Sequence, residues 1–411
     1  MRRILFVDDD AMVLDGLSDA LRKDRSRWQM VFATSGDDAL RHFDEGTFDV
    51  VVADVRMPGL DGPSLLAAIK EQHPGTARLV LSGQADSTSS RRLLSLAHQY
   101  LAKPVSAARI REVLDRTCRL RELLADERLV DAVGGVEQLP VVPALLARLD
   151  ELLDDPGASI RDIADLVEAD PGLSAKVIQL VSSAFFGLPR RITSLAEAVM
   201  YLGLSVLRHL VVSIGLMNSF PDLPPPASAV AAGVRERGWV TGALARAMAV
   251  DLETSSGDEA FLAGVVHDVG LLVLLSSSPV YPGVLAAAQA TGRPLHAVES
   301  EVLGVTHGEV GAYLLGLWGL PTAVVEAVAH HHEPWNVPAE RFDLPGIVYV
   351  AQALVWERFG PEAVGERDLA ELAGRDYLQG LGVGDRLDGW RSMLDRLLDP
   401  TADDPAMGKA S

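Results

Sequence analysis

The sequence predicts two domains of different class: a doubly wound α/β domain with five parallel strands, followed by an all-α domain. Up to about residue 120, short runs of Val, Ile and Leu alternate with apolar residues at helical spacing, which is typical of a parallel sheet with helical crossovers. From Pro143 onward nearly all the apolar patterns have helical spacing. A chain of 411 residues is long enough for two or three domains, each with its own core.

The composition narrows the range of partners. A net charge of -20 argues against DNA, RNA or an anionic membrane as the main partner. Cys118 is the only cysteine, which excludes an intrachain disulfide and fits a cytoplasmic protein. The apolar run in MRRILFVDDD is too short for a signal peptide. We expect no membrane span, because the most apolar stretch, AFLAGVVHDVGLLVLL, carries His267 and Asp268.

Five apolar segments are the expected strands of the first domain: Ile4 to Val7, Gln29 to Ala33, Val50 to Val52, Ala77 to Leu81 and Tyr100 to Ala102. Each is followed by residues with helical spacing, including a helix from Arg91 to His98 and a last one that starts near Ser106. Asp10 and Ser35 stand where the first two helices need an N-cap. Right-handed crossovers then make the sheet doubly wound.

Chemically active residues follow four of these strands. Asp8 and Asp9, then Asp54, Ser82 and Lys103, stand at the carboxyl ends, which share one edge of a parallel sheet. Three carboxylates so close repel one another and require a hard divalent cation, for which Mg²⁺ is the natural choice. A lysine and a hydroxyl beside them would receive a transferred phosphoryl group. Alternatively, these residues have ordinary structural roles: a solvent-exposed residue at a strand end, a turn former, a helix cap or a surface cation.

This domain resembles the receiver domain of two-component response regulators over its whole length. The resemblance implies that Asp54 is the phospho-acceptor, that Lys103 pairs with the phosphoryl oxygens, and that a histidine kinase is the phosphoryl donor. It implies that Asp9, Asp54 and the backbone carbonyl of Arg56 bind Mg²⁺, with Asp8 acting through water. Ser82 and Tyr100 would be the switch residues, and Pro104 matches the family's Lys-Pro pair.

The segment after the first domain has two interpretations. Its less polar residues fall at steps of three and four: Val113, Thr117, Leu120 and Leu124. They would form either a helix that pairs with a second copy in a homodimer, or a single amphipathic helix on its own domain. Gly134-Gly135 and Leu139-Pro140 then mark a boundary.

Histidines concentrate in the second domain. His267 and Asp268 are expected inside one apolar helix, and His307 and the run His330-His331-His332 come from two others. A buried His and Asp are costly unless paired or bound to metal, so the sequence predicts either a metal site or mutually hydrogen-bonded histidines in the core.

This half resembles the HDOD domain, a relative of the HD phosphohydrolases, in stretches such as DPGLSAKVIQLVSSAFFG, AFLAGVVHDVG and AVAHHHEP. The HD hydrolases have an upstream histidine and a late aspartate, but here the matching helices read RERGWVTGALARAMA and IVYVAQALVW, with Gln352 at the late position. His267, Asp268, His307, His331 and His332 are therefore interpreted as a degenerate HD site with no cofactor assigned.

Together these resemblances predict a cytoplasmic response regulator with a non-catalytic output domain that binds a protein partner. The alternative is a phosphorylation-gated HD phosphohydrolase acting on a cyclic dinucleotide or nucleotide. The expected boundaries are a receiver domain at 1–122, a helical linker at 123–137, an HDOD domain at 138–340 and a helical extension with a disordered tail at 341–411.

Overall fold

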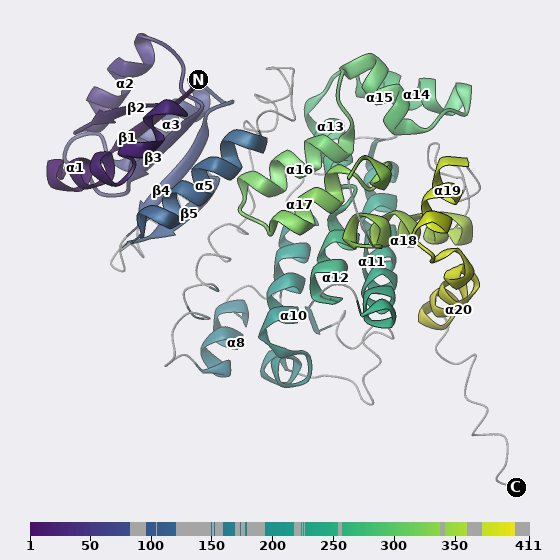
Figure 1. Ribbon diagram of the computed structural model, residues 1–411. Coiled ribbons are helices and arrows are strands. Elements are labelled where there is room, and N and C mark those ends of the chain that lie inside the picture. The colour runs from purple at the N-terminus through teal and green to yellow at the C-terminus, as the bar shows by residue number, and fades with distance from the viewer. Residues whose placement is uncertain are drawn as a thin grey trace, which may run out of the picture.

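The computed structural model describes residues 1–82, 96–103, 105–120, 159–168, 194–217, 227–253, 257–337, 342–359 and 372–398, with a few single residues between these ranges. A parallel sheet with its helices forms the N-terminal part, and a larger helical domain follows (Figure 1). The predicted fold class, α/β followed by all-α, is confirmed.

The sheet has the strand order β2-β1-β3-β4-β5, and every neighbouring pair is parallel. Its strands are β1 (Arg2–Val7), β2 (Trp28–Ala33), β3 (Val50–Asp54), β4 (Ala77–Ser82) and β5 (Gln99–Ala102). The chain order reverses between β1 and β3, and the carboxyl ends of these two strands carry Asp8 and Asp54. In open α/β sheets, such a reversal is where ligands bind.

The helices of this domain begin as expected. They are α1 (Ala11–Ala20), α2 (Gly36–Asp44), α3 (Gly62–Gln72) and α5 (Ala107–Leu120), with a short 3-10 helix at Arg22–Ser26. The Asp10 carboxylate accepts from the Met12 amide at 2.8 Å, and the Ser35 hydroxyl accepts from the Asp38 amide at 3.2 Å. Both predicted N-caps are thus confirmed. The helix expected at Arg91 to His98 falls largely outside the described residues, and residues 96–98 are not helical.

Two apolar layers cover the sheet. On one face, Val51 and Leu5 pack with Phe43 of α2 and Leu65 of α3. On the other face, Phe6 and Val52 belong to a cluster that also contains residues of α1 and α5. That second cluster continues through α5 into the helical domain, so one connected core spans both parts of the chain.

The helical domain is built around long central helices. Its described helices are α8 (Ile160–Glu168), α10 (Leu195–Met217), α11 (Ala227–Leu252), α12 (Gly257–Val266), α13 (Val269–Ser277), α14 (Tyr281–Thr291), α15 (Leu295–Leu303), α16 (His307–Leu317), α17 (Thr322–Ala329), α18 (Leu344–Phe359), α19 (Leu372–Gly380) and α20 (Leu387–Leu398). A Cβ on Gly264 of α12 would lie 2.7 Å from the Cα of Gly242 in α11. Only glycines allow these two helices to approach so closely.

The C-terminal helices pack on this domain as expected. Trp390 of α20 is buried at 1% exposure, and its ring stacks on Phe342. The Trp390 indole N–H also donates to the Asp251 carboxylate at the end of α11, at 3.2 Å. Residues 341–411 therefore contribute to the core of the helical domain over the part that the structure describes.

One predicted element is wrong. His267 and Asp268 do not lie inside a continuous helix, because α12 ends at Val266 and α13 begins at Val269. Asp268 takes the N-cap position of α13, where its side chain turns toward several histidines rather than capping the helix. Apolar residues flank the break on both sides, so nothing in the sequence pattern marks the turn.

The two helices α12 and α13 together pass a length and hydropathy test for a membrane span, as Gly257–Ser277. However, 83% of the apolar window is buried inside the protein, as expected of core helices. Among the described residues, no other helix passes the test.

Several expectations fall on residues outside the description. These are the linker helix beyond Leu120, the helix opening at Asp170-Pro171, the Lys-Pro partner Pro104 and the tail from residue 399 onward.

Candidate functional sites

The first site lies at the carboxyl edge of the sheet. The Lys103 ammonium, directly after β5, donates to the Asp8 carboxylate at 2.8 Å and also to the Asp54 carboxylate. Burial acts to lower the pKa of Lys103, but the hydrogen bonds to Asp54 and Asp8 outweigh it and raise that pKa. Lys103 is therefore a permanent cation between two carboxylates, which reduces their mutual repulsion.

The backbone around Asp54 fixes the orientation of its carboxylate. The Arg56 amide donates to Asp54 Oδ2 at 2.9 Å, so the two carboxylate oxygens have different partners. The turn after β3 folds back at Gly62, where a Cβ would lie 2.2 Å from the Asp54 carbonyl oxygen. A side chain at position 62 would displace the backbone that carries Asp54.

The structure places the other predicted residues of this site only in part. Asp8 is 2% exposed, whereas Asp9 next to it is exposed at the edge of the sheet. Ser82 ends β4, and Tyr100 lies in β5 opposite Val80. The side chains of Ser82 and Tyr100 are outside the description, so their switch roles stay predictions.

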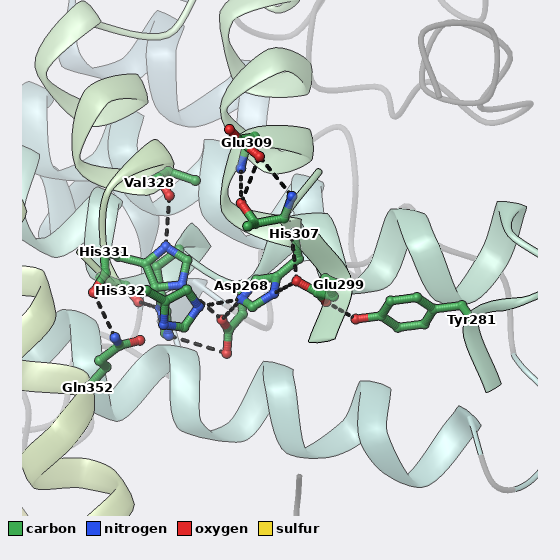
Figure 2. A network of polar contacts seen from close by, with 12 residues as sticks. Asp268, Tyr281, Glu299, His307, Glu309, Val328, His331, His332 and Gln352 are labelled. Carbon is green, nitrogen blue, oxygen red and sulfur yellow. Dashed lines mark hydrogen bonds and ion pairs between the residues drawn. The ribbon is translucent and has the colours of Figure 1, made fainter. Parts of the chain in front are cut away.

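The second site is a buried cluster of histidines around Asp268 (Figure 2). The Asp268 Oδ1 atom lies 3.4 Å from His307 Nε2 and 3.5 Å from His331 Nε2. The Asp268 Oδ2 atom lies 3.2 Å from His267 Nε2. His332 Nε2 is 2.8 Å from His307 Nε2. The structure therefore brings together all five residues of the predicted degenerate site.

The helix ends position these side chains. Asp268 opens α13, His307 is the first residue of α16, and His331 follows the end of α17. The Thr306 hydroxyl and the Glu309 carboxylate form a capping box at the start of α16. A Cβ on Gly270 would lie 1.9 Å from the His307 carbonyl oxygen, so α13 and α16 touch backbone to backbone.

Sequence reasoning missed Glu299, which is fully buried on α15. Its carboxylate accepts from the His307 backbone amide at 2.8 Å, from His307 Nδ1 at 2.7 Å and from the Tyr281 hydroxyl. The signal was an acid among the apolar residues of LHAVESEVL, because Glu299 is one helical turn after the buried Leu295. His296, whose ring stacks on His332 at 4.4 Å, was missed as well.

Burial and the neighbouring charges shift the pKa values of several groups in this cluster. Burial acts to lower the pKa of His307, but Glu299 and Asp268 outweigh it and raise that pKa well above its usual value. Burial likewise opposes ionisation of Asp268, but His267 and its neighbours hold the pKa of that carboxyl well below its usual range. Burial lowers the pKa of His331 to about 4 and, with His331 nearby, lowers the pKa of His332.

Gln352 stabilises the turn that follows α17. Its side-chain amide donates to the His331 carbonyl at 2.8 Å, which holds the turn that carries His331 and His332. An amide at this position supplies no carboxylate to the cluster.

The two parts of the chain meet where β5 and α5 contact α16 and the turn after it. The Gln99 side-chain amide donates to the Leu317 carbonyl at 3.0 Å, and the Arg116 guanidinium donates to the Leu320 carbonyl at 3.4 Å. Gly319 lies between them with a φ of 81°, and a Cβ there would be 2.8 Å from the Gln99 amide nitrogen. In Figure 1, α5 lies between the sheet and α16.

Comparisons with known proteins agree with this division. A model of the response regulator receiver domain matches residues 4–115, and a model of the HDOD domain matches residues 139–334. The chain therefore belongs to the proteins in which a receiver domain is followed by an HDOD domain, as the sequence predicted.

The relatives match parts of this arrangement. An uncharacterized protein of Treponema pallidum is 27% identical over 238 residues, which is 56% of this chain and 43% of that protein. The transcriptional regulatory protein TrcR of Mycobacterium tuberculosis is 35% identical over 133 residues, 31% of this chain and 50% of that protein. The chain thus spans half or less of these relatives.

Among solved structures, one from Marinobacter aquaeolei of a protein assigned to signal transduction shares the fold. It is 21% identical, the match covers 81% of each chain, and the TM-score is 0.51.

Proposed function

We propose that this chain is a cytoplasmic response regulator whose Asp54 is phosphorylated by a histidine kinase. The observation that supports this most strongly is the position of Lys103, whose ammonium bridges Asp8 and Asp54 at the carboxyl edge of the sheet. A receiver domain at residues 4–115 and relatives among transcriptional regulatory proteins support the same function.

The chemistry follows from this arrangement. An Asp54 oxygen attacks the phosphorus of a phosphohistidine in line, so that a new P–O bond forms as the P–N bond to the kinase histidine breaks. Lys103 turns from the free carboxylate to the phosphoryl oxygens and balances their charge. Mg²⁺, bound by Asp9, Asp54 and the Arg56 carbonyl, with Asp8 through water, would supply the remaining positive charge. Ser82 would hydrogen-bond the phosphate, and Tyr100 would move inward with it.

The signal would reach the HDOD domain through two elements in series. β5 connects the phosphorylation site to the contact with the HDOD domain. Lys103 follows the last residue of this strand, and Gln99, its first residue, contacts α16. α16 continues the path, since its last residue, Leu317, accepts from Gln99 and its first residue, His307, lies in the histidine cluster. A helix of this length spans about 16 Å.

The HDOD domain would act as a non-catalytic output that binds a protein partner. Gln352 stands at the position expected for a late metal-binding acid, and it holds the His331 carbonyl instead. The cluster around Asp268 keeps an HD phosphohydrolase as the second candidate. A phosphodiesterase assay with cyclic dinucleotides separates the two, because turnover that disappears in Asp268→Ala would contradict the non-catalytic function.

Phosphoryl transfer tests the first step. With a small-molecule phosphoryl donor and Mg²⁺, the wild-type chain should gain one phosphate that hydroxylamine removes, as expected of an acyl phosphate, and Asp54→Asn none. Asp49→Asn is the control, because Asp49 binds Arg2 beside the amino end of β3 and should not affect labelling. Equal labelling of Asp54→Asn and wild type would remove the proposal.

Partner binding tests the second step. A pull-down with phosphorylated and unphosphorylated chains should differ in the proteins retained. Sedimentation of the same samples shows whether phosphorylation instead brings two copies together. If both measurements are unchanged by phosphorylation, the HDOD domain is not the output.

A further inference from the structure

Four ligand atoms in the HDOD domain lie at distances that suit one metal ion. They belong to Asp268, His307, His331 and His332, and all lie within 4.8 Å of one another. A tetrahedral ion with bonds of about 2.0–2.1 Å to nitrogen or oxygen needs its ligands about 3.3–3.4 Å apart. The distances from Asp268 Oδ1 to the Nε2 atoms of His307 and His331 are 3.4 and 3.5 Å. The His307–His332 pair, at 2.8 Å, would have to open slightly.

Hydrogen bonds on the far side of the rings fix their orientation. His331 Nδ1 lies 2.7 Å from the Val328 carbonyl and therefore donates to it. His307 Nδ1 donates to the Glu299 carboxylate at the same distance of 2.7 Å. In both rings, Nε2 is therefore the atom that faces Asp268. Metal-ligating histidines are usually held in this way, with the second ring nitrogen donating to a carbonyl or carboxylate.

One buried atom in this cluster has no hydrogen bond. His331 is fully buried, and its Nε2 atom has no hydrogen-bond partner. Because the ring's only proton in the neutral form is on Nδ1, this Nε2 presents a lone pair to the negatively charged Asp268 oxygen 3.5 Å away. Two electron-rich atoms that face each other in a protein interior repel each other, and a metal cation between them would turn this repulsion into attraction.

We propose that Asp268, His307, His331 and His332 bind one divalent transition-metal ion of the Zn²⁺ class. Three imidazole nitrogens and one carboxylate oxygen suit such an ion better than Mg²⁺ or Ca²⁺, which prefer oxygen ligands. All four tetrahedral positions are filled by the protein, so the ion is a structural centre and has no open position for a hydrolytic water. This assignment goes beyond the signalling function and does not depend on it.

The ion would hold three helices together. Asp268 opens α13, His307 opens α16, and His331 and His332 follow α17. Glu299 acts as a positioning residue, because it orients His307 through the Nδ1 contact.

A titration of the full chain tests the site. The purified protein is stripped with a chelator, supplied with excess Mg²⁺ to occupy the carboxylates of the receiver domain, and titrated with Co²⁺ as a visible probe. We expect one Co²⁺ per chain with the absorption of a four-coordinate ion, displaced by one equivalent of Zn²⁺. Glu299→Gln should weaken Co²⁺ binding by about 10–100-fold, and His331→Ala should weaken it further.

His330→Ala is the matched control, because it removes an adjacent histidine that is not among the four ligands and should leave Co²⁺ affinity unchanged. Circular dichroism checks the fold of each variant. If His331→Ala does not fold, the wild-type stoichiometry and Glu299→Gln still decide the question. The proposal is overturned if the wild-type chain binds no Co²⁺ in excess Mg²⁺, if the bound ion has the spectrum of an octahedral oxygen site, or if His331→Ala and Glu299→Gln bind as wild type does.

Discussion

The close contact between α13 and α16 predicts that Gly270→Ala destabilises the protein, whereas the same substitution at an uncrowded helical glycine does not. A Cβ on Gly270 would meet the His307 carbonyl oxygen at 1.9 Å and the Gly311 amide nitrogen at 2.7 Å. Both are backbone atoms, so no side-chain rotation relieves the clash. To reach an ordinary contact of 3.4 Å, the His307 backbone must move by 1.5 Å, the difference between 3.4 and 1.9 Å.

Gly270→Ala should therefore destabilise the HDOD domain by about 1–3 kcal/mol, the usual cost of inserting a methyl group into a well-packed interior. For a domain of this size, each kcal/mol lowers Tm by about 2–4 °C. The same shift moves His307, one of the four proposed ligands, so Co²⁺ affinity should also fall.

Gly389→Ala is the control for this prediction. Gly389 lies in α20, and a Cβ there would meet no atom within 4 Å. Alanine in a helix is favoured over glycine by about 0.5–1 kcal/mol, so this variant should raise Tm slightly. Thermal denaturation of both variants gives the answer. A Gly270→Ala chain that melts at or above the wild-type temperature would refute the close packing of α13 on α16.

Three further substitutions test other parts of the structure. Lys103→Ala should leave Asp8 and Asp54 without their shared cation, so Mg²⁺ should bind more tightly while phosphorylation of Asp54 slows, as measured by Mg²⁺ titration and labelling. Arg78→Ala should destabilise the receiver domain by about 3 kcal/mol or more, as measured by chemical denaturation. The buried guanidinium donates to three carbonyls, and each carbonyl left without its partner costs about 1–3 kcal/mol. Trp390→Ala should cost about 3–5 kcal/mol in the same assay, and a neutral result would mean that α20 does not belong to the HDOD core.

The receiver site could be predicted from the sequence because its geometry follows from topology. Asp8, Asp54 and Lys103 each stand directly after a strand, and the carboxyl ends of parallel strands must meet at one edge. The identity of the residues and their positions in the strands were therefore sufficient. The N-caps at Asp10 and Ser35 were predictable for a similar reason, since a cap depends on only a few neighbouring residues.

The histidine cluster could be predicted only in part. Its composition was evident, but the turn at His267-Asp268 was not, because apolar residues flank it on both sides. Glu299 comes from α15, a separate element, and nothing in its local spacing connects it to His307. The docking of Gln99 on Leu317 joins residues 218 positions apart, and such a contact depends on tertiary packing.

The central claim is that phosphorylation of Asp54 changes the contact between β5 and α16. Hydrogen–deuterium exchange of the full chain tests it, with Mg²⁺ and beryllofluoride as a stable mimic of the phosphoryl group. We expect altered exchange at residues 316–321, which surround the Gln99 contact, in wild type and in the exposed control Gln72→Ala, but not in Asp54→Asn. In Gln99→Ala these residues should exchange faster without the mimic and respond less to it. Unchanged exchange at residues 316–321 in the wild-type chain, with a clear response around Asp54, would contradict the account.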